Sequence, residues 1–412
     1  MPSVATSARD LWSEIVRVAL FGGAFDPFHL AHLEMIDSCW ALGKYEQLIV
    51  MPTGLSPHKN LQASLAAYRY ETCRLALQDH DEGILLSDEE IVYPGISYTV
   101  DTVGRLKAAA ATDALTIDLL IGSDSLLAIH KWYKYEQLLK EVGLVVAVRN
   151  PAQIKEINDQ AQKISRQYNT RIEILQMEPI PISSTKVREA LLGGESADHL
   201  LPPSVASFIN DNKIYAFASD LSGLSSDWLY LQKLEQIQWP LLSQERRVHV
   251  LNVMQYSIHL AKIHKVDLRR AAVAGLLHDY AKYLPLDDQY EAAPQDFIDL
   301  NDKIVHAPAC AYYVKSDLGI DDQGILDAIC YHTTSHPQID NLGKIIYLAD
   351  KIEYGREFKS LPPIRRMAEL DLDRAMLMCL DEVFLALERQ GREAHPFTKA
   401  SYDTISKAVR NR

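Results

Sequence analysis

The chain has few cysteines and none of them form a recognisable pair. No CxxC motif occurs in the 412 residues, and the cysteines are odd in number and widely scattered. This spacing excludes a disulfide framework and a thiolate zinc site. We therefore predict reduced thiols and a cytoplasmic protein. The five positions are Cys39, Cys73, Cys310, Cys330 and Cys379.

Long apolar runs and an excess of positive charge are also missing. No run approaches the roughly 18 apolar residues of a membrane span. Residues 1–15 contain Arg9, Asp10 and Glu14 and lack the apolar core of a signal peptide. The net charge of −13 argues against a surface that coats nucleic acid, because phosphate backbones require clustered cations. Neither membrane nor nucleic acid is expected as a partner, whereas small phosphorylated ligands need only a few local cations.

The length predicts two or three domains. From Val16 to about Phe217, short β-rich runs alternate with helical stretches, which predicts an α/β fold with a doubly wound parallel sheet. Ligands bind such sheets at the carboxyl ends of the strands. The predicted strands are 16–21, 47–52, 117–121, 143–148 and 171–176.

The character of the chain changes at the polar segment 218–226, beyond which helical periodicity dominates. An all-α domain is therefore predicted to follow the sheet. Helices are expected at 244–264, 269–284, 303–317, 321–332, 341–354 and 372–390. The predicted organisation is an N-terminal extension at 1–15, a first domain at 16–217, a linker at 218–239 and a helical domain at 240–412.

The most informative motif of the first domain is Gly-Gly-Ala-Phe-Asp-Pro-Phe-His-Leu-Ala-His at 22–32. Glycines at a strand end let backbone N–H groups approach a phosphate, and the N-terminus of the following helix favours anions. His29 and His32 are three residues apart, so on a helix they share one face. The motif predicts a polyphosphate site with two imidazole donors.

Four further segments follow predicted strands or begin predicted helices. Lys59 ends a Gly/Pro-rich loop at 51–59, and hydroxyls at 97–102 begin a helix. Each has a simpler interpretation, as a surface lysine and as an N-cap. Segment 121–125 with the aromatic residues that follow it predicts either a ribose or base pocket or ordinary core packing. The hydroxyls and cations at 182–188 indicate a second anion site.

Together these motifs resemble the nicotinate-mononucleotide adenylyltransferase family across 16–217. The motifs are GGAFDPFHLAH, PTGLSPHK, SYTVDT, GSDSL followed by Trp, and ISSTKVR. The resemblance implies that ATP and nicotinate mononucleotide give the deamido dinucleotide and pyrophosphate. Ala24 stands where the family usually has Thr, and Ala31 where it usually has Gly. Both residues are small, so tighter packing rather than lost chemistry is expected.

The resemblance also implies a role for each matching residue. His29 and His32 would contact the ATP phosphates, and Lys59 would hold phosphate near the transfer point. Mg²⁺ would bridge the triphosphate, since it binds largely through substrate oxygens. Ser184, Thr185 and Arg188 would grip the β/γ end. The backbone of Gly22, Gly23, Ala24 and Phe25 would lie along the nucleotide. The remaining pocket residues would be Thr99, Gly122, Asp124, Trp132 and Tyr133.

In the second domain, residues 271–282 read Ala-Ala-Val-Ala-Gly-Leu-Leu-His-Asp-Tyr-Ala-Lys. Such an apolar helix must be buried, and burying His278 beside Asp279 is costly unless something satisfies both. A metal ion is the simplest partner. His249 lies upstream on a periodic helix, and Asp350 lies downstream at the end of an apolar run.

His249, His278, Asp279 and Asp350 resemble the metal ligands of the HD phosphohydrolase superfamily. Over about 240–400 the chain resembles the bacterial HD-domain family that hydrolyses diadenosine tetraphosphate symmetrically to two ADP. The closer motifs are 305–312, 331–334 and 347–353. Ser335 stands where that family usually has Gly, which predicts an altered loop over the site.

The ligand set indicates iron or manganese, because mixed imidazole and carboxylate ligands suit such divalent ions. His306 and His332 would contact phosphate, assist proton transfer or complete a second metal position, and these alternatives stay open. Lys282 would neutralise phosphate charge or form a surface salt bridge. Asp279 is also the expected catalytic carboxylate of this domain.

Two alternative functions remain open at this stage. The helical domain would be a non-catalytic nucleotide sensor or act on another nucleotide, or the first domain would use a different acceptor. The segment 122–124 with Trp132 argues against a different acceptor. The preference for nicotinate over nicotinamide mononucleotide and the oligomeric state, a homo-oligomer included, also stay open.

Overall fold

The computed structural model describes residues 17–55, 64–110, 115–148, 150–178, 180–216, 222–297 and 302–412. It divides into two compact units, Met1–Phe208 and Ile209–Arg412. The division falls inside helix α10 (Pro203–Asp211). The predicted N-terminal extension at 1–15 and the predicted phosphate ligand Lys59 lie outside the described residues.

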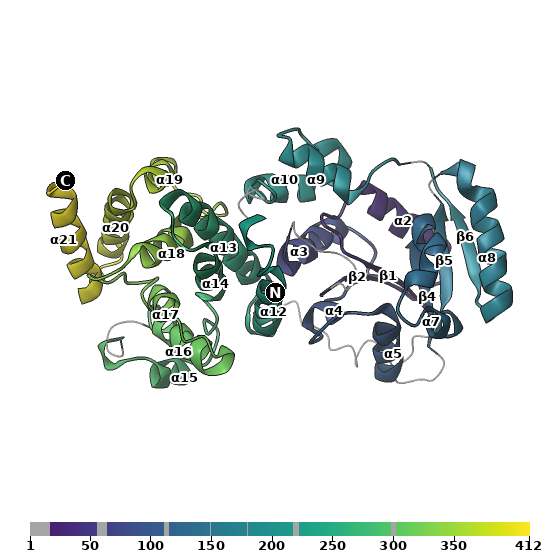
Figure 1. The fold of residues 1–412 in the computed structure, drawn as a ribbon, viewed down its shortest axis with the longest axis horizontal. Coiled ribbons are helices and arrows are strands. Elements are labelled where there is room, and N and C mark those ends of the chain that lie inside the picture. The colour runs from purple at the N-terminus through teal and green to yellow at the C-terminus, as the bar shows by residue number, and fades with distance from the viewer. Residues whose placement is uncertain are drawn as a thin grey trace. The chain divides into compact units, whose positions relative to one another are not determined.

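The first unit is built on a parallel sheet of six described strands in the order β3-β2-β1-β4-β5-β6, with helices on both faces (Figure 1). This confirms the predicted doubly wound fold. The strands are β1 (Arg17–Gly23), β2 (Gln47–Pro52), β3 (Ile84–Leu86), β4 (Thr116–Gly122), β5 (Gly143–Val148) and β6 (Ile172–Gln176). The prediction missed β3 because a three-residue strand carries no readable alternation.

The order of the strands positions the first site. The sequence moves outward from β1 to β2 and β3, then returns to the other side of β1 with β4, so β1 and β4 flank the point where the winding reverses. Ligands bind outside the carboxyl ends of strands at such a point. The helices of this unit are α2 (Leu30–Trp40), α3 (Ala66–Leu77), α4 (Glu89–Val92), α5 (Thr99–Ala109), α6 (Ser123–Leu127), α7 (Tyr135–Glu141), α8 (Ile154–Tyr168) and α9 (Ser184–Leu192).

The second unit is helical, as predicted. Its helices are α12 (Trp228–Gln238), α13 (Gln244–His264), α14 (Leu268–Leu277), α15 (Leu286–Ala292), α16 (His306–Leu318), α17 (Gln323–Cys330), α18 (Asn341–Ile352), α19 (Leu361–Leu370), α20 (Leu372–Arg389) and α21 (Pro396–Arg410). Two predictions need correction. The helix expected at 269–284 ends at Leu277, and the chain continues in tight turns that bond Lys282 N–H to the Asp279 carbonyl.

The second correction concerns 218–239, which the sequence predicts as a linker. Within it, Trp228–Gln238 form helix α12. Trp228, Leu231 and Leu234 recur at helical spacing and are buried, and α12 packs on α14. The apolar face of this segment therefore stabilises a helix that its polar flanking residues concealed.

Helices α13 and α14 pack closely because a glycine lies at their crossing. A Cβ atom on Gly275 would lie 2.8 Å from the Cα atom of Met254 on α13. The close approach brings the end of α14, where His278 follows, next to His249 on α13. Helix α18 packs on both helices and carries Asp350 in its last turn.

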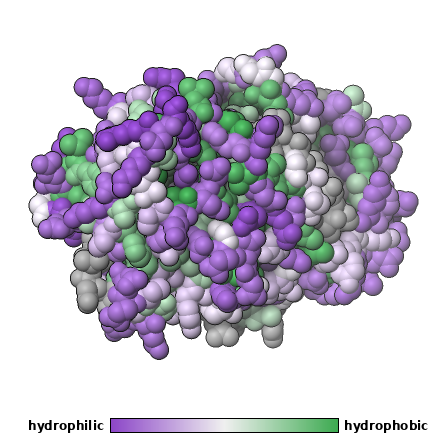
Figure 2. Space-filling model, turned by 60° about the vertical axis from the view of Figure 1, so that its left-hand side comes forward, coloured by the Kyte–Doolittle hydropathy of each residue, from purple (hydrophilic) through white to green (hydrophobic). Residues whose placement is uncertain are grey.

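The surface carries hydrophobic side chains in separate positions. Figure 2 shows one face on which they stand in small groups among hydrophilic side chains. Among the described helices, none combines the length and apolarity that crossing a bilayer requires. All five cysteines are unpaired thiols.

The contact at Gly275 leads to a stability prediction. Gly275→Ala should push α14 away from α13 and lower the unfolding free energy of the second unit by about 1–3 kcal/mol, as overpacking does. Thermal unfolding of the full chain measures this. The control is Gly104→Ala inside α5, where an added Cβ meets no atom within 4 Å. It should be neutral or gain up to about 1 kcal/mol from helix propensity. Equal effects of both substitutions would refute the packing argument.

Two candidate active sites

A cavity of about 300 Å³ opens at the carboxyl end of the sheet in the first unit. It is formed by the end of β1, the residue after β2, the start of α5 and two aromatic side chains. Among its lining residues are Gly22, Gly23, Ala24, Thr53, Glu90, Tyr98, Thr99, Trp132 and Tyr133. Six of the residues predicted to bind nucleotide are thus brought together. Gly122 ends β4 and Asp124 is exposed in the first turn of α6, and neither is among the described lining residues.

His29 and His32 lie side by side at the start of α2. The helix begins at Leu30, so His29 precedes it as the N-cap residue rather than lying on the predicted helical face. The His29 N–H donates to Nδ1 of His32 at 3.2 Å, and the two rings stack with centroids 3.6 Å apart. The expected pairing of the two imidazoles is confirmed, although a capping contact and ring stacking produce it.

The motif at 182–188 reaches the first motif through hydrogen bonds. Ser183 caps α9 by accepting from the Lys186 N–H at 3.2 Å. Ser184 Oγ donates to the Pro27 carbonyl at 3.1 Å, and Arg188 Nη1 donates to the Asp26 carbonyl at 2.6 Å. The N-terminus of α9 therefore lies against the loop that leads to His29.

Glu90 is a lining residue that the sequence analysis missed. Its side chain is 7% exposed, and Thr102 Oγ1 donates to Oε1 at 2.7 Å. Burial raises the pKa of the Glu90 carboxyl to about 7, against the opposing effect of the Thr102 hydrogen bond. Glu90 lies on the one-turn helix α4, which has no motif or periodicity that would mark this carboxylate in the sequence. Tyr98, whose ring lies 4.3 Å from that of Tyr133, belongs to the SYTVDT motif and could have been found there.

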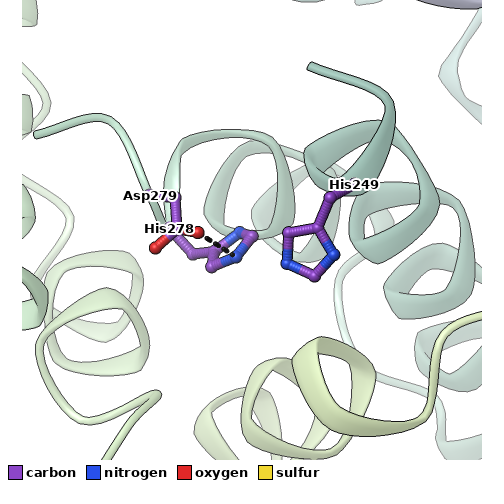
Figure 3. Close-up of side chains that lie close together, drawn as sticks. All are labelled: His249, His278 and Asp279. Atoms are coloured by element: carbon purple, nitrogen blue, oxygen red, sulfur yellow. Dashed lines mark ion pairs between the residues drawn. The ribbon is translucent and has the colours of Figure 1, made fainter. Parts of the chain in front are cut away.

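The second site gathers side chains from separate helices around Asp279. His249 comes from α13, and His278 and Asp279 follow α14 (Figure 3). His278 Nε2 lies 3.4 Å from Asp279 Oδ2, and the His249 and His278 ring centroids are 5.3 Å apart. Possible ligand atoms of these three residues all lie within 4.8 Å of one another.

Asp279 also belongs to a second group of potential ligands. Its Oδ1 atom lies 3.2 Å from Nε2 of His306 and 3.6 Å from Nε2 of His332. Atoms of Asp279, His306 and His332 again lie within 4.8 Å of one another. One carboxylate therefore connects both groups of imidazoles, including the two histidines whose role the sequence left open.

Asp350 completes the first group from the end of α18. Its Oδ1 atom lies 3.1 Å from Nε2 of His249 and 3.8 Å from Nε2 of His278. The other ring nitrogen of His249, Nδ1, lies 3.1 Å from Oε1 of buried Glu353. Such a carboxylate behind a histidine fixes the orientation of the ring. Glu353 belongs to the motif 347–353, but the sequence alone indicated no role for it.

These residues fit a divalent metal ion. Nε2 of His278 and Oδ1 of Asp279 are shielded from solvent and make no hydrogen bond among the described residues. Leaving buried polar atoms in this state is costly. Burial lowers the pKa of His306, and it lowers the pKa of His332 to about 4. A lowered pKa favours the neutral imidazole, which is the form that binds metal, and imidazole and carboxylate groups together are common ligands of divalent ions.

Cationic side chains surround the carboxylates. Arg246 Nη1 donates to Asp279 Oδ2 at 2.9 Å, and Lys351 Nζ donates to Asp350 Oδ2 at 3.2 Å. Lys282 Nζ lies 2.9 Å from Nε2 of His306, so it faces the cluster. Burial raises the pKa of Asp279, but the contacts with His278 and the other two imidazoles outweigh it and hold that pKa well below 3.8.

Ser335 adopts the left-handed conformation, with φ of +60°. This conformation favours glycine over residues with a side chain. The Ser335 side chain is buried, and its Oγ lies 2.7 Å from Oγ of Ser401 on α21. The Ser335 hydroxyl thus forms a hydrogen bond between the loop after His332 and α21.

Comparison with known proteins supports both halves of the chain. A sequence profile described as Cytidylyltransferase-like matches residues 20–190, and one described as HD domain matches 246–355. The chain is 29% identical to the probable nicotinate-nucleotide adenylyltransferase/Ap4A hydrolase of Mycoplasma genitalium, over 89% of this chain and 97% of that protein. For the Mycoplasma pneumoniae protein of the same name the identity is 30%, over 81% and 88%.

The second unit also resembles single-domain proteins. The symmetrical bis(5'-nucleosyl)-tetraphosphatase of Halalkalibacterium halodurans is 35% identical, over 42% of this chain and 95% of that protein.

The raised pKa of Glu90 gives a pH prediction. In the folded chain this pKa is about 7 rather than 4.5, so Glu90 costs nothing below pH 4.5 and increasingly destabilises the first unit up to pH 7. The neutral Glu90→Gln variant escapes this loss. Its stability relative to wild type should rise by about 3 kcal/mol between pH 4.5 and 8, at 1.36 kcal/mol per pH unit.

Urea unfolding of the first unit across this pH range measures the difference between Glu90→Gln and wild type. A pH-independent difference would contradict the prediction. Thr102→Val is a directional companion variant, because the Thr102 hydrogen bond lowers the pKa of Glu90. Removing that bond should raise the folded pKa of Glu90 further and extend the upper end of the window of stability loss to higher pH.

Proposed function

Because this chain belongs to the family of two-domain proteins named nicotinate-nucleotide adenylyltransferase/Ap4A hydrolase, we propose that it is a bifunctional enzyme of NAD biosynthesis. The first unit transfers the adenylyl group of ATP to nicotinate mononucleotide. The second unit hydrolyses diadenosine tetraphosphate to two ADP. The observation that carries the proposal is that each unit brings side chains suited to phosphate or metal together at one place, His29 with His32 in the first and two histidine–carboxylate groups in the second.

In the first unit the acceptor phosphate attacks the ATP α-phosphorus, and the bond to pyrophosphate breaks. Catalysis then consists of positioning and of neutralising charge on the α-phosphoryl group and the leaving pyrophosphate. His29 and His32 lie together at the helix N-terminus, where donors and the helix dipole favour anions. Arg188 and Ser184 lie against the same loop and would hold the leaving end. Mg²⁺ is the expected cofactor of this half.

The cavity beside these residues suits the nicotinate nucleotide. Thr99, Trp132 and Tyr133 line it, and Tyr133, which packs on Tyr98 and is 45% exposed, would stack its ring on a planar substrate ring. Glu90 is also among its lining residues. The proposed preference for nicotinate over nicotinamide mononucleotide follows the names of the relatives.

In the second unit, His249, His278, Asp279 and Asp350 would hold iron or manganese, with His306 and His332 completing a second position. Such a metal supplies an activated water and polarises a phosphoryl oxygen. Glu353 orients His249, and Arg246 and Lys282 would neutralise the phosphates of the substrate. A cytoplasmic location stays a prediction, supported by the five unpaired thiols.

An activity assay on the full chain tests both halves of the proposal. One arm supplies ATP, Mg²⁺ and nicotinate mononucleotide, and the other supplies diadenosine tetraphosphate with Fe²⁺ or Mn²⁺. His278→Ala should lose at least ~100-fold in hydrolysis, since it removes a ligand, and retain transfer. His32→Ala should lose about 10²-fold in transfer, as for a removed transition-state donor, and retain hydrolysis. Transfer without hydrolysis in wild type would instead indicate a sensor domain.

Metal content provides a test that needs no activity. Asp279→Ala should lose bound iron or manganese more completely than His249→Ala, because Asp279 contributes to both groups of ligands. The control is His259→Ala. His259 lies on α13, as His249 does, but pairs with Glu369. This variant should retain the wild-type metal content, as measured by atomic absorption. Metal-free wild type after anaerobic purification with iron would contradict the proposed cluster.

A further inference from the structure

Arg69 is a buried cation outside both sets of predicted site residues. It lies on α3, and 1% of its surface is exposed. A guanidinium group is seldom buried without a carboxylate partner. Here, two main-chain carbonyl oxygens take that place. Nη1 donates to the Ala24 carbonyl at 2.8 Å, and Nη2 donates to the Thr53 carbonyl at 2.7 Å.

The two carbonyls belong to the loops that follow adjacent strands. β1 and β2 pair as far as Gly23 and Pro52, and the Thr53 N–H then donates to the Gly23 carbonyl at 2.8 Å. Beyond this point no backbone hydrogen bond joins the described residues of the two loops, 24–29 and 53–55. Arg69 connects the two loops in place of such bonds, because its planar guanidinium group donates to one carbonyl of each loop.

Both loops contribute to the wall of the cavity described above, through Ala24 and Thr53, beside Gly22 and Gly23 at the end of β1. In a trans peptide the N–H points opposite to the C=O. Holding the Ala24 carbonyl therefore fixes the direction of the Phe25 N–H, away from Arg69. Phe25 has a φ of +48°, a conformation that residues with a side chain seldom adopt. Arg69 thus restrains a strained turn in the Gly22–Phe25 segment.

A second contact prevents the β2 loop from adjusting in the other direction. A Cβ atom at Gly54 would lie 2.0 Å from the Glu90 carbonyl, so this loop already touches the backbone of α4. The loop is held between Arg69 on one element and Glu90 on another. Loss of either contact would therefore let the loop, and with it Thr53 in the cavity wall, change position.

From this arrangement we infer that Arg69 is a positioning residue of the adenylyl-transfer site. It holds the main chain of both loops so that the cavity wall, with the Phe25 N–H beside it, is preorganised for the nucleotide. This rests on the adenylyl-transfer activity proposed above. Arg69 itself is covered by the loops and acts through their carbonyl groups, without touching the substrate.

The test compares Arg69→Met and Arg69→Lys in the full chain. Methionine fills much of the same volume without a donor, so KM for ATP should rise at least tenfold, with a further fall in kcat for transfer. Lysine supplies a charge and reaches one carbonyl, so it should recover part of the loss in kcat/KM. Hydrolysis of diadenosine tetraphosphate by the same preparations should be unchanged.

The matched control is Arg17→Met. Arg17 Nη2 pairs with buried Asp118 at 2.8 Å near the amino end of the sheet, away from the cavity. This variant should lower the melting temperature of the first unit and leave both kinetic constants for transfer near those of wild type. It separates loss of stability from loss of positioning.

The outcomes distinguish the inference from the function on which it rests. Absence of transfer in wild type would refute the function. Wild-type KM and kcat in Arg69→Met would overturn the inference while the function stands. Equal kinetic losses in Arg17→Met and Arg69→Met would also overturn it, as would a lysine variant no better than methionine. If the methionine variant fails to fold, the split between KM and kcat in Arg69→Lys decides.

Discussion

The carboxylate of Asp279 is the centre around which the second unit is arranged. It is buried within contact distance of His278, His306 and His332, which come from the chain after α14, the start of α16 and the end of α17. A buried charge is tolerated only with compensating partners. The helices that supply these partners must therefore keep their relative positions, and the close α13–α14 crossing at Gly275 is one means of doing so.

The first unit also buries a charged side chain, but the charge is positive and its hydrogen-bond partners are main-chain carbonyl groups. Arg69 is buried where strands β1 and β2 separate, and it satisfies carbonyl groups that the sheet no longer pairs. Glu90 is buried nearby and relies on one hydroxyl. In both units, helices or strands end at the site. Backbone carbonyl groups at or just beyond these ends accept hydrogen bonds from buried polar side chains.

Much of this architecture could be predicted from the sequence because its signals are local. Buried strands read as apolar runs, and the histidine and hydroxyl motifs follow them directly. Arg69, Glu90 and Glu353 could not be found in this way, because their roles depend on partners distant in sequence or on main-chain atoms. His29 was expected on the helical face beside His32, whereas it precedes α2 as its N-cap residue. Helix α12 was missed because the polar segment before it masked its apolar spacing.

The chain is acidic overall, yet both sites are directed at polyphosphates, and the local pairing of cations resolves this. Arg188 is bonded to the Asp26 carbonyl, Arg246 to Asp279 and Lys351 to Asp350. Each cation is held in place before any ligand arrives, so little side-chain entropy remains to be lost on binding. A metal that neutralises Asp279 and Asp350 would weaken the charge pairing of Arg246 and Lys351 while both cations stay beside the site, available to phosphate. Metal and substrate binding in the second unit would then strengthen each other, as thermodynamic linkage requires.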